Sequence, residues 1–174
     1  MASATQLAPA VSITFADLLR YQESETAKWR AWLEEQPPEL LDLPFGDAAK
    51  QMGSVRGMLW HIFIVEWVYA CVINDEPFGG WSQFQRETLA DLFVIRDQAH
   101  ARLSTYLARA TEADMTRRLT LTGDNTTIHG SARKFLAHTF FHSLRHWAQL
   151  ATVLRQHGHQ TDWHHDFVLS DVME

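Results

Sequence analysis

The sequence has one cysteine and no concentration of positive charge, and each absence excludes a class of protein. Cys71 stands alone, so no intrachain disulfide can form, and a reducing compartment is its natural location. The 15 Lys and Arg residues are outnumbered by 21 Asp and Glu, which gives a net charge of −6 and leaves no basic stripe. Because phosphate binding needs concentrated positive charge, we expect neither nucleic acid nor a membrane surface as partner.

Features of secretion and membrane insertion are also absent from the pattern. Residues 1–13 have neither a basic start nor a long apolar stretch, so they do not resemble a signal peptide. We expect no apolar run approaching the ~20 residues of a membrane helix. The length of 174 residues suits one domain with a hydrophobic core. We therefore predict a soluble, cytoplasmic protein with a loose tail over residues 1–13 and a single domain over residues 14–174.

Four segments show the three- and four-residue apolar spacing of amphipathic helices. Between the third and the fourth, two short β-branched runs surround the turn Gly123-Asp124-Asn125, which predicts a small hairpin or an extended excursion. The fold class that follows is all-α, a four-helix bundle with a long connection before the last helix. The predicted helices, the second capped by Ser54 and the fourth by Ser131, span about residues 14–36, 54–74, 87–110 and 131–156.

The residues in excess are histidine, with ten, and tryptophan, with seven. Histidine is the commonest metal ligand. His142 and His146 lie about 40° apart on one helix face, one turn from each other, and such a pair is a two-ligand site for a transition metal. A third ligand must come from another element, and His61 is the best candidate because it lies mid-helix on an apolar stripe of small neighbours.

A purely structural role for these histidines is the alternative. A single core histidine is more often a hydrogen-bonded polar residue than a ligand. Burying three imidazoles without partners would, however, cost roughly 1–3 kcal/mol for each unpaired group, which favours the metal site.

Three further polar residues are candidates near this site. Gln149 shares the face of the histidine pair and could bond a ligand imidazole or a metal-bound water, although a buried glutamine bonded to backbone is equally open. His138 is four residues before His142 but drifts to the edge of the face, and we expect it outside the ligand set. Arg96 could attract an anionic substrate, although an arginine at a stripe edge more commonly extends to water.

The remaining histidines give weaker signals. His100 and His129 have no partner in the sequence. Four others lie past the end of the last helix, where we expect a solvated, flexible segment: His157, His159, His164 and His165. We also expect residues 162–174 to wrap back over the bundle through Trp163, Phe167, Val168 and Leu169.

The order and spacing of these motifs resemble the DinB/YfiT-like superfamily of metal-dependent helical proteins. The fourth helix of that family has a His, three residues, then His-Arg-Gly-Gln, an apolar run, a Leu-Gly stop and an Asp-Phe ending. Here His142-Ser-Leu-Arg-His146-Trp-Ala-Gln149 fills the first part, and Gly158 and Asp166-Phe167 follow. The second-helix ligand of the family corresponds to His61, and the resemblance extends over residues 14–170.

The resemblance implies one divalent metal ion, zinc or nickel, bound by His61, His142 and His146, and often a homodimer. Trp147-Ala148 replaces the usual Arg-Gly of the family, so the role of that arginine is in doubt here. Arg145 precedes His146, and we expect it to point to a different side.

Three neutral imidazoles leave a coordination position open, which is the pattern of catalytic rather than structural metal sites. Such an ion can lower the pKa of bound water towards 7 or bind and ionise a thiol. Members of the superfamily include thiol-dependent transferases and isomerases. We therefore predict a metal-dependent enzyme of the thiol-transferase or hydrolase class, acting on a small molecule or a low-molecular-weight thiol, although no general base is evident.

The competing hypothesis is a non-catalytic, metal-stabilised or stress-related sensing module that forms a dimer. Its basis is apolar surface on helix faces away from the histidines, which either forms a dimer interface or is covered by the termini. The residues concerned are Trp60, Trp67, Phe140, Phe141, Leu144 and Trp147.

Overall fold

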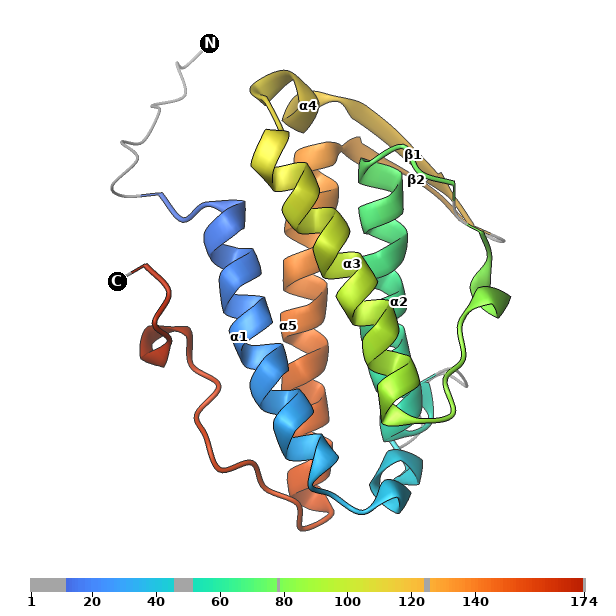
Figure 1. Cartoon of the computed structure of the whole chain (residues 1–174), viewed down its shortest axis with the longest axis vertical. Helices are drawn as coiled ribbons and strands as arrows, with labels where there is room; N and C mark the ends of the chain where they lie inside the picture. The colour runs from blue at the N-terminus through green and yellow to red at the C-terminus, as the bar shows by residue number, and fades with distance from the viewer. Residues whose placement is uncertain (1–11, 46–51, 78, 124–125, 174) are drawn as a thin grey trace.

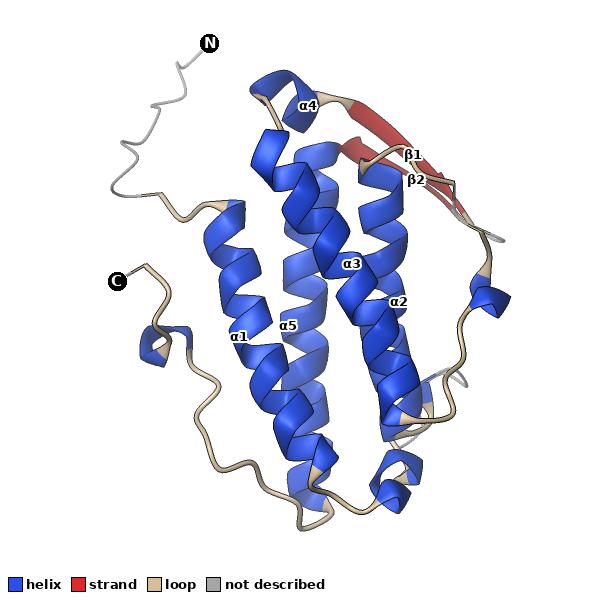
Figure 2. Ribbon diagram, viewed as in Figure 1, coloured by secondary structure: helices blue, strands red, loops and turns tan. Residues whose placement is uncertain are grey.

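The computed structural model describes residues 12–45, 52–77, 79–123 and 126–173. Four long helices lie side by side along the long axis of the molecule, and a short helix and two strands lie across one end (Figure 1). Within the described residues the fold is mostly helical, with one small sheet (Figure 2). The long helices are α1 (Phe15–Glu34), α2 (Val55–Ile73), α3 (Leu89–Arg109) and α5 (Ala132–Gln156), and the short one is α4 (Glu112–Thr116).

Side-chain caps explain where the long helices begin. Thr14 and Thr88 each accept a hydrogen bond from the backbone three residues later, and the acidic residue there bonds back to the cap. Ser54 and Ser131, the two caps predicted from the sequence, accept from the backbone in the same way. Gly158, with φ of +84°, follows the end of α5. The four predicted helices are therefore confirmed to within about two residues at each end.

The connection between α3 and α5 contains more structure than the sequence indicates. The predicted hairpin is present, with β1 (Arg118–Thr122) antiparallel to β2 (Thr127–Ser131). Helix α4 was not predicted, because five residues with no buried side chain give no apolar periodicity. The predicted all-α fold class is therefore corrected, because a small two-stranded sheet accompanies the helices.

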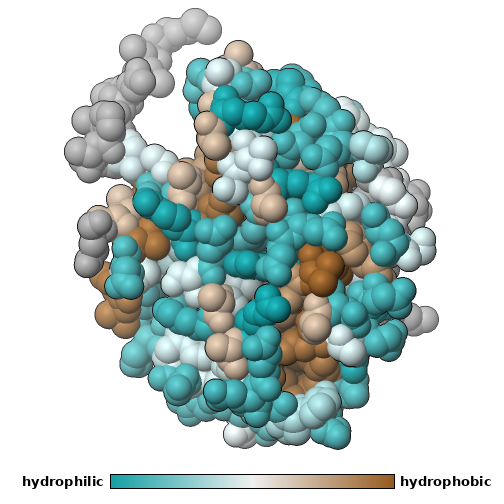
Figure 3. All heavy atoms as spheres, in the orientation of Figure 1, coloured by the Kyte–Doolittle hydropathy of each residue, from teal (hydrophilic) through white to brown (hydrophobic). Residues whose placement is uncertain are grey.

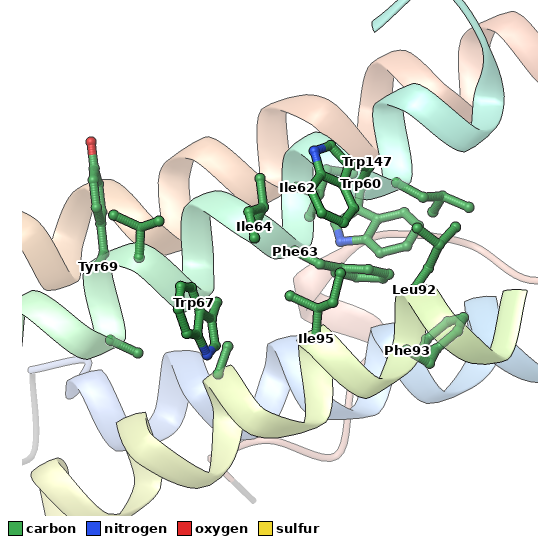
Figure 4. Close-up of a cluster of buried hydrophobic side chains, with 14 of the residues drawn as sticks. Trp60, Ile62, Phe63, Ile64, Trp67, Tyr69, Leu92, Phe93, Ile95 and Trp147 are labelled. Carbon is green, nitrogen blue, oxygen red and sulfur yellow. The ribbon is translucent and has the colours of Figure 1, made fainter. Parts of the chain in front are cut away.

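Helix α2 lies at the centre of the apolar core. Figure 4 shows Phe63 and Trp67 pointing from α2 toward α3, where the rings of Phe63 and Phe93 are 5.2 Å apart, and Trp147 reaching in from α5. With 19 residues, α2 is long and apolar enough to cross a membrane by length and composition, contrary to our expectation that no such run exists. However, 67% of the 18-residue window that meets this criterion is buried inside the protein, as in the core helix of a globular fold.

The C-terminal segment runs beside α1 and contains one short 3-10 helix, η5 (Phe167–Leu169) (Figure 1). Trp163 packs edge-on against Trp29 with ring centroids 5.3 Å apart, and Phe167 contacts Tyr21 at 4.8 Å. The predicted wrapping through these two aromatic residues is confirmed. The same prediction is wrong for two further side chains, which are 83% and 61% exposed: Val168 and Leu169.

His165 also differs from the prediction of a solvated segment. Its ring stacks on Trp29 at 5.0 Å, and its Nδ1 lies 3.2 Å from a carboxylate oxygen of Glu25. The aromatic face of Trp29 and the acid on α1 therefore hold this part of the segment in place. The predicted N-terminal tail falls largely on residues 1–11, outside the described residues.

The face of the molecule formed by α1 and α3 is mostly hydrophilic, with apolar side chains in small patches (Figure 3). Such scattered apolar exposure is normal for a folded protein and marks no particular site.

Candidate metal centre

Three histidines from two helices converge where α2 packs against α5. Nε2 of His142 lies 3.0 Å from Nε2 of His61, and one ring nitrogen of each of His61, His142 and His146 lies within 4.8 Å of the others. His142 and His146 are 6% and 4% exposed, and His61 is half-buried. The predicted trio is therefore brought together, and no carboxylate or thiol joins the cluster among the described residues.

The donor set fits a divalent transition metal. Imidazole suits zinc and nickel, and two nitrogens bound to one ion at about 2.0–2.1 Å lie roughly 3.3 Å apart in a tetrahedral arrangement. The 3.0 Å separation of the two Nε2 atoms is close to that value. Nδ1 of His142 is buried and has no hydrogen-bond partner among the described residues.

The protonation state suits metal binding as well. Burial, followed by the neighbouring imidazoles and Arg145, lowers the pKa of His61 to about 4 and that of His142 to about 3. Burial also lowers the pKa of His146, with Arg145 adding to the effect. All three rings are thus neutral at pH 7 and keep a lone pair for a cation.

Gln149 fixes the orientation of one of these rings. Its Oε1 lies 2.6 Å from Nδ1 of His146. An amide oxygen can only accept, so Nδ1 carries the proton and Nε2 keeps the lone pair. Partners of this kind hold a metal-ligating histidine in one tautomer and one position. The residue is exposed, so the alternative of a buried glutamine bonded to backbone does not apply.

The direction of the Arg145 side chain was predicted wrongly from the sequence. We expected it to point away from the site, yet its Nη2 lies 3.1 Å from Nε2 of His146. Helical phase fixes the direction of Cβ, whereas a long arginine side chain can bend back over the next residue. The one feature of the sequence that could have indicated this contact is that Arg145 directly precedes His146.

The other two predicted site residues lie outside the cluster. His138 is exposed, and its ring centroid is 5.5 Å from that of His142 and 5.5 Å from that of Tyr69. Arg96 lies on α3, where it pairs with Asp97 at 3.0 Å and reaches the backbone oxygen of Glu23. It belongs to the contact between α1 and α3 and is not brought to the histidines.

A second buried polar cluster links all four long helices and was missed from the sequence. Glu66 on α2 is 1% exposed and accepts hydrogen bonds from Gln22 on α1 and Ser143 on α5. Its Oε2 lies 3.4 Å from Nε2 of His100 on α3. Glu66 is the one acidic residue of α2, and a charge inside so apolar a helix was the signal that could have revealed it.

His100 is therefore not without a partner. Burial opposes its protonation, but the carboxylates of Glu23 and Glu66 outweigh that effect and raise its pKa. Nδ1 of His100 lies 3.7 Å from Glu23, so the ring stands between two acids. When His100 is protonated, this arrangement is a buried ion pair that connects helices, which contrasts with the lowered pKa values of the histidines in the metal cluster.

The fold and the histidine cluster define a class: a helical protein with a candidate three-histidine metal centre between two of its helices. The sequence matches the DinB family over residues 5–169, and the chain belongs to that family. The crystal structure of YjoA, a DinB-like protein from Bacillus subtilis, is similar with a TM-score of 0.57 and 20% identity, covering 82% of this chain and 93% of that chain. At that identity the likeness shows the fold. No curated protein sequence matches this chain.

Proposed function

We propose that this protein is a metal-dependent enzyme whose four long helices form a four-helix bundle around one divalent ion, zinc or nickel, bound by His61, His142 and His146. The observation that supports it is the convergence of three neutral imidazoles with no fourth protein ligand in the described part of the cluster. Three protein ligands leave a position for substrate, as in catalytic sites. A bound ion of this kind supplies a Lewis acid that can ionise a thiol or a water molecule at neutral pH.

The residues of the chain prepare this site in three ways. Burial keeps His61 and His142 unprotonated, as their lowered pKa values indicate. Gln149 holds the ring of His146 in one tautomer. His61 is only half-buried, so a small substrate can approach from its side of the cluster. These features favour a transferase or hydrolase acting on a small molecule or a low-molecular-weight thiol in the cytoplasm.

A second candidate function is a metal-stabilised dimeric binding module without turnover. Phe141 and Leu144 on α5 are 65% and 52% exposed, beside a cavity of about 270 Å³ between α1 and α5. Large apolar side chains that remain exposed beside a cavity favour an interface with a partner. The other apolar residues predicted for such an interface are buried within the chain: Trp60, Trp67, Phe140 and Trp147.

Elemental analysis of purified protein tests the metal site. We expect one zinc or nickel per chain in the wild type and loss of the metal from three variants, His61→Ala, His142→Ala and His146→Ala. His138→Ala, on the same helix but outside the cluster, is the matched control and should keep the metal. Stoichiometric metal in all four variants would show that the site is elsewhere.

Removing the metal with a chelator distinguishes the enzyme hypothesis from the binding-module hypothesis. Metal removal lowers Tm under both hypotheses, because the ion binds only the folded state. The enzyme additionally requires metal-dependent turnover in a screen of thiol-transfer and hydrolysis substrates. A large loss of Tm without any turnover would favour the module.

A further inference from the structure

We propose that Arg145 binds an oxyanion group of the substrate, so that the molecule accepted by this site carries a negative charge next to its metal-binding group. This inference rests on the proposed function and names the substrate class for the same site. It begins from the contact between the Arg145 guanidinium and Nε2 of His146, at 3.1 Å.

The Arg145 guanidinium lies against the lone pair on Nε2 of His146, which a metal would need. Nδ1 of His146 is committed to Gln149, so Nε2 is the free acceptor of the ring. Arginine has donors alone and stays charged, and a cation and an N–H cannot share one lone pair. Metal binding therefore requires the guanidinium to leave Nε2, while its attachment beside His146 keeps it at the edge of the cluster.

Arg145 forms no ion pair within the part of the chain that the structure describes, unlike Arg20 and Arg102. Among the same described residues, Arg155 on the same helix also lacks an ion pair, but only Arg145 has its guanidinium against a histidine of the cluster. An arginine with several free donors in a planar fork is suited to carboxylate or phosphate oxygens.

The charge of the site also favours a negatively charged substrate. Histidine binds a metal as a neutral imidazole, and the cluster contains no acid among the described residues. A divalent ion with a guanidinium beside it concentrates positive charge without compensation. A site of one sign of charge in a partly buried position attracts ligands of the opposite sign and raises their local concentration. A substrate with an oxyanion supplies the missing negative charge.

The test uses the protein loaded with cobalt(II), whose visible absorption changes when a thiolate binds. The probes are 3-mercaptopropionate, which is anionic, and 3-mercapto-1-propanol, which is neutral and of the same length. We expect the wild type to bind the anionic thiol on the order of tenfold more tightly than the neutral one, as one charged hydrogen-bonded contact provides. Competition by acetate or by inorganic phosphate then indicates which oxyanion the site prefers.

Variants assign this preference to Arg145. Arg145→Gln should reduce the ratio of the two dissociation constants to about one or two, and Arg145→Lys, which keeps the charge, should retain part of it. Arg155→Gln is the matched control, because Arg155 is an exposed arginine of α5 that lines the cavity between α1 and α5. Arg145→Gln should also bind cobalt more tightly than the wild type in the absence of thiol, since nothing then competes for Nε2 of His146.

The outcomes distinguish the inference from the proposed function. If the wild type binds cobalt and thiols but Arg145→Gln and Arg145→Lys keep the full preference, the role of Arg145 is wrong and the metal site stands. If the wild type binds no cobalt, or cobalt without any response to thiols, the proposed function fails first, and the inference fails with it.

Discussion

The amide oxygen of Gln149 lies 2.6 Å from Nδ1 of His146, one helical turn along the same helix. This contact puts the proton of the ring on Nδ1 and leaves the lone pair on Nε2. It therefore ties metal affinity to a residue that would not itself touch the ion.

Replacing Gln149 should weaken metal binding without abolishing it. We expect Gln149→Ala to raise the zinc dissociation constant by roughly 10–100-fold, because the ring of His146 then has no fixed tautomer. Competition titration against a chromogenic chelator measures this change. Gln149→Glu keeps an acceptor and is the control. Unchanged affinity in Gln149→Ala would mean that Gln149 does not orient the ligand.

Removing one member of the buried Glu66–His100 pair should destabilise the fold strongly. Glu66→Ala leaves His100 without its inner acid and removes the acceptor for Gln22 and Ser143. Breaking a buried pair in this way costs about 3–5 kcal/mol in the free energy of unfolding. Urea denaturation measures it, and the double variant Glu66→Ala, His100→Ala should lose less than the sum of the single changes. Additive losses would contradict direct coupling of the two residues.

The same pair predicts a pH dependence of definite sign. The pKa of His100 is raised in the folded protein, so its contribution to stability is fully present below the unfolded value of about 6.5. That contribution is lost as the pH rises through the folded pKa. His100→Gln should therefore cost more stability at pH 6 than at pH 9, as measured by urea unfolding of metal-free protein. An equal cost at both values would show that His100 is not protonated.

The metal cluster predicts the opposite sign in metal-free protein. The pKa values of His61 and His142 are lowered to about 4 and about 3, so the unfolded chain takes up protons first as the pH falls. Stability contributed by these rings is present above about pH 6.5 and is lost progressively toward pH 3. His142→Gln should thus flatten the decrease in Tm between pH 7 and pH 4.5. A decrease as steep as that of the wild type would contradict burial of a neutral ring.

The exposed apolar pair of α5 gives a prediction about assembly. If Phe141 and Leu144 form an interface between two copies, light scattering should find a dimer at micromolar concentration. The double variant Phe141→Glu, Leu144→Glu should then be a monomer with unchanged metal content, because neither residue belongs to the histidine cluster. Val94 on α3 is 50% exposed, and Val94→Glu is the control for a charge placed elsewhere. A monomeric wild type would exclude the dimer.

Features that depend on residues close together in the sequence could be predicted from it. The helix starts follow from caps such as Ser54 and Ser131, which act over three residues. The spacing of His142 and His146 follows from helical geometry in the same way. His61 came from its place on an apolar stripe and from the family motif, since nothing local links it to a helix 81 residues away.

Features that depend on how helices meet could not be predicted. The partners of Glu66 come from α1, α3 and α5, and no spacing in the sequence relates them. The position of Arg145 depends on the rotamer of a long side chain rather than on the phase of its helix. Val168 and Leu169 are apolar but exposed, because hydrophobicity alone does not tell which side of the short 3-10 helix Phe167–Leu169 faces the core.

The distance along the chain between His61 and His142 has a consequence for folding. An ion shared by the two rings would join positions 81 residues apart in the chain, on either side of α3, α4 and the hairpin. Unlike a disulfide, it would join them only while α2 is docked on α5, so its binding free energy would add to the stability of that pairing. Metal affinity would then report how firmly these two helices are paired, so a change anywhere in their contact should register in a binding titration even when every ligand is intact.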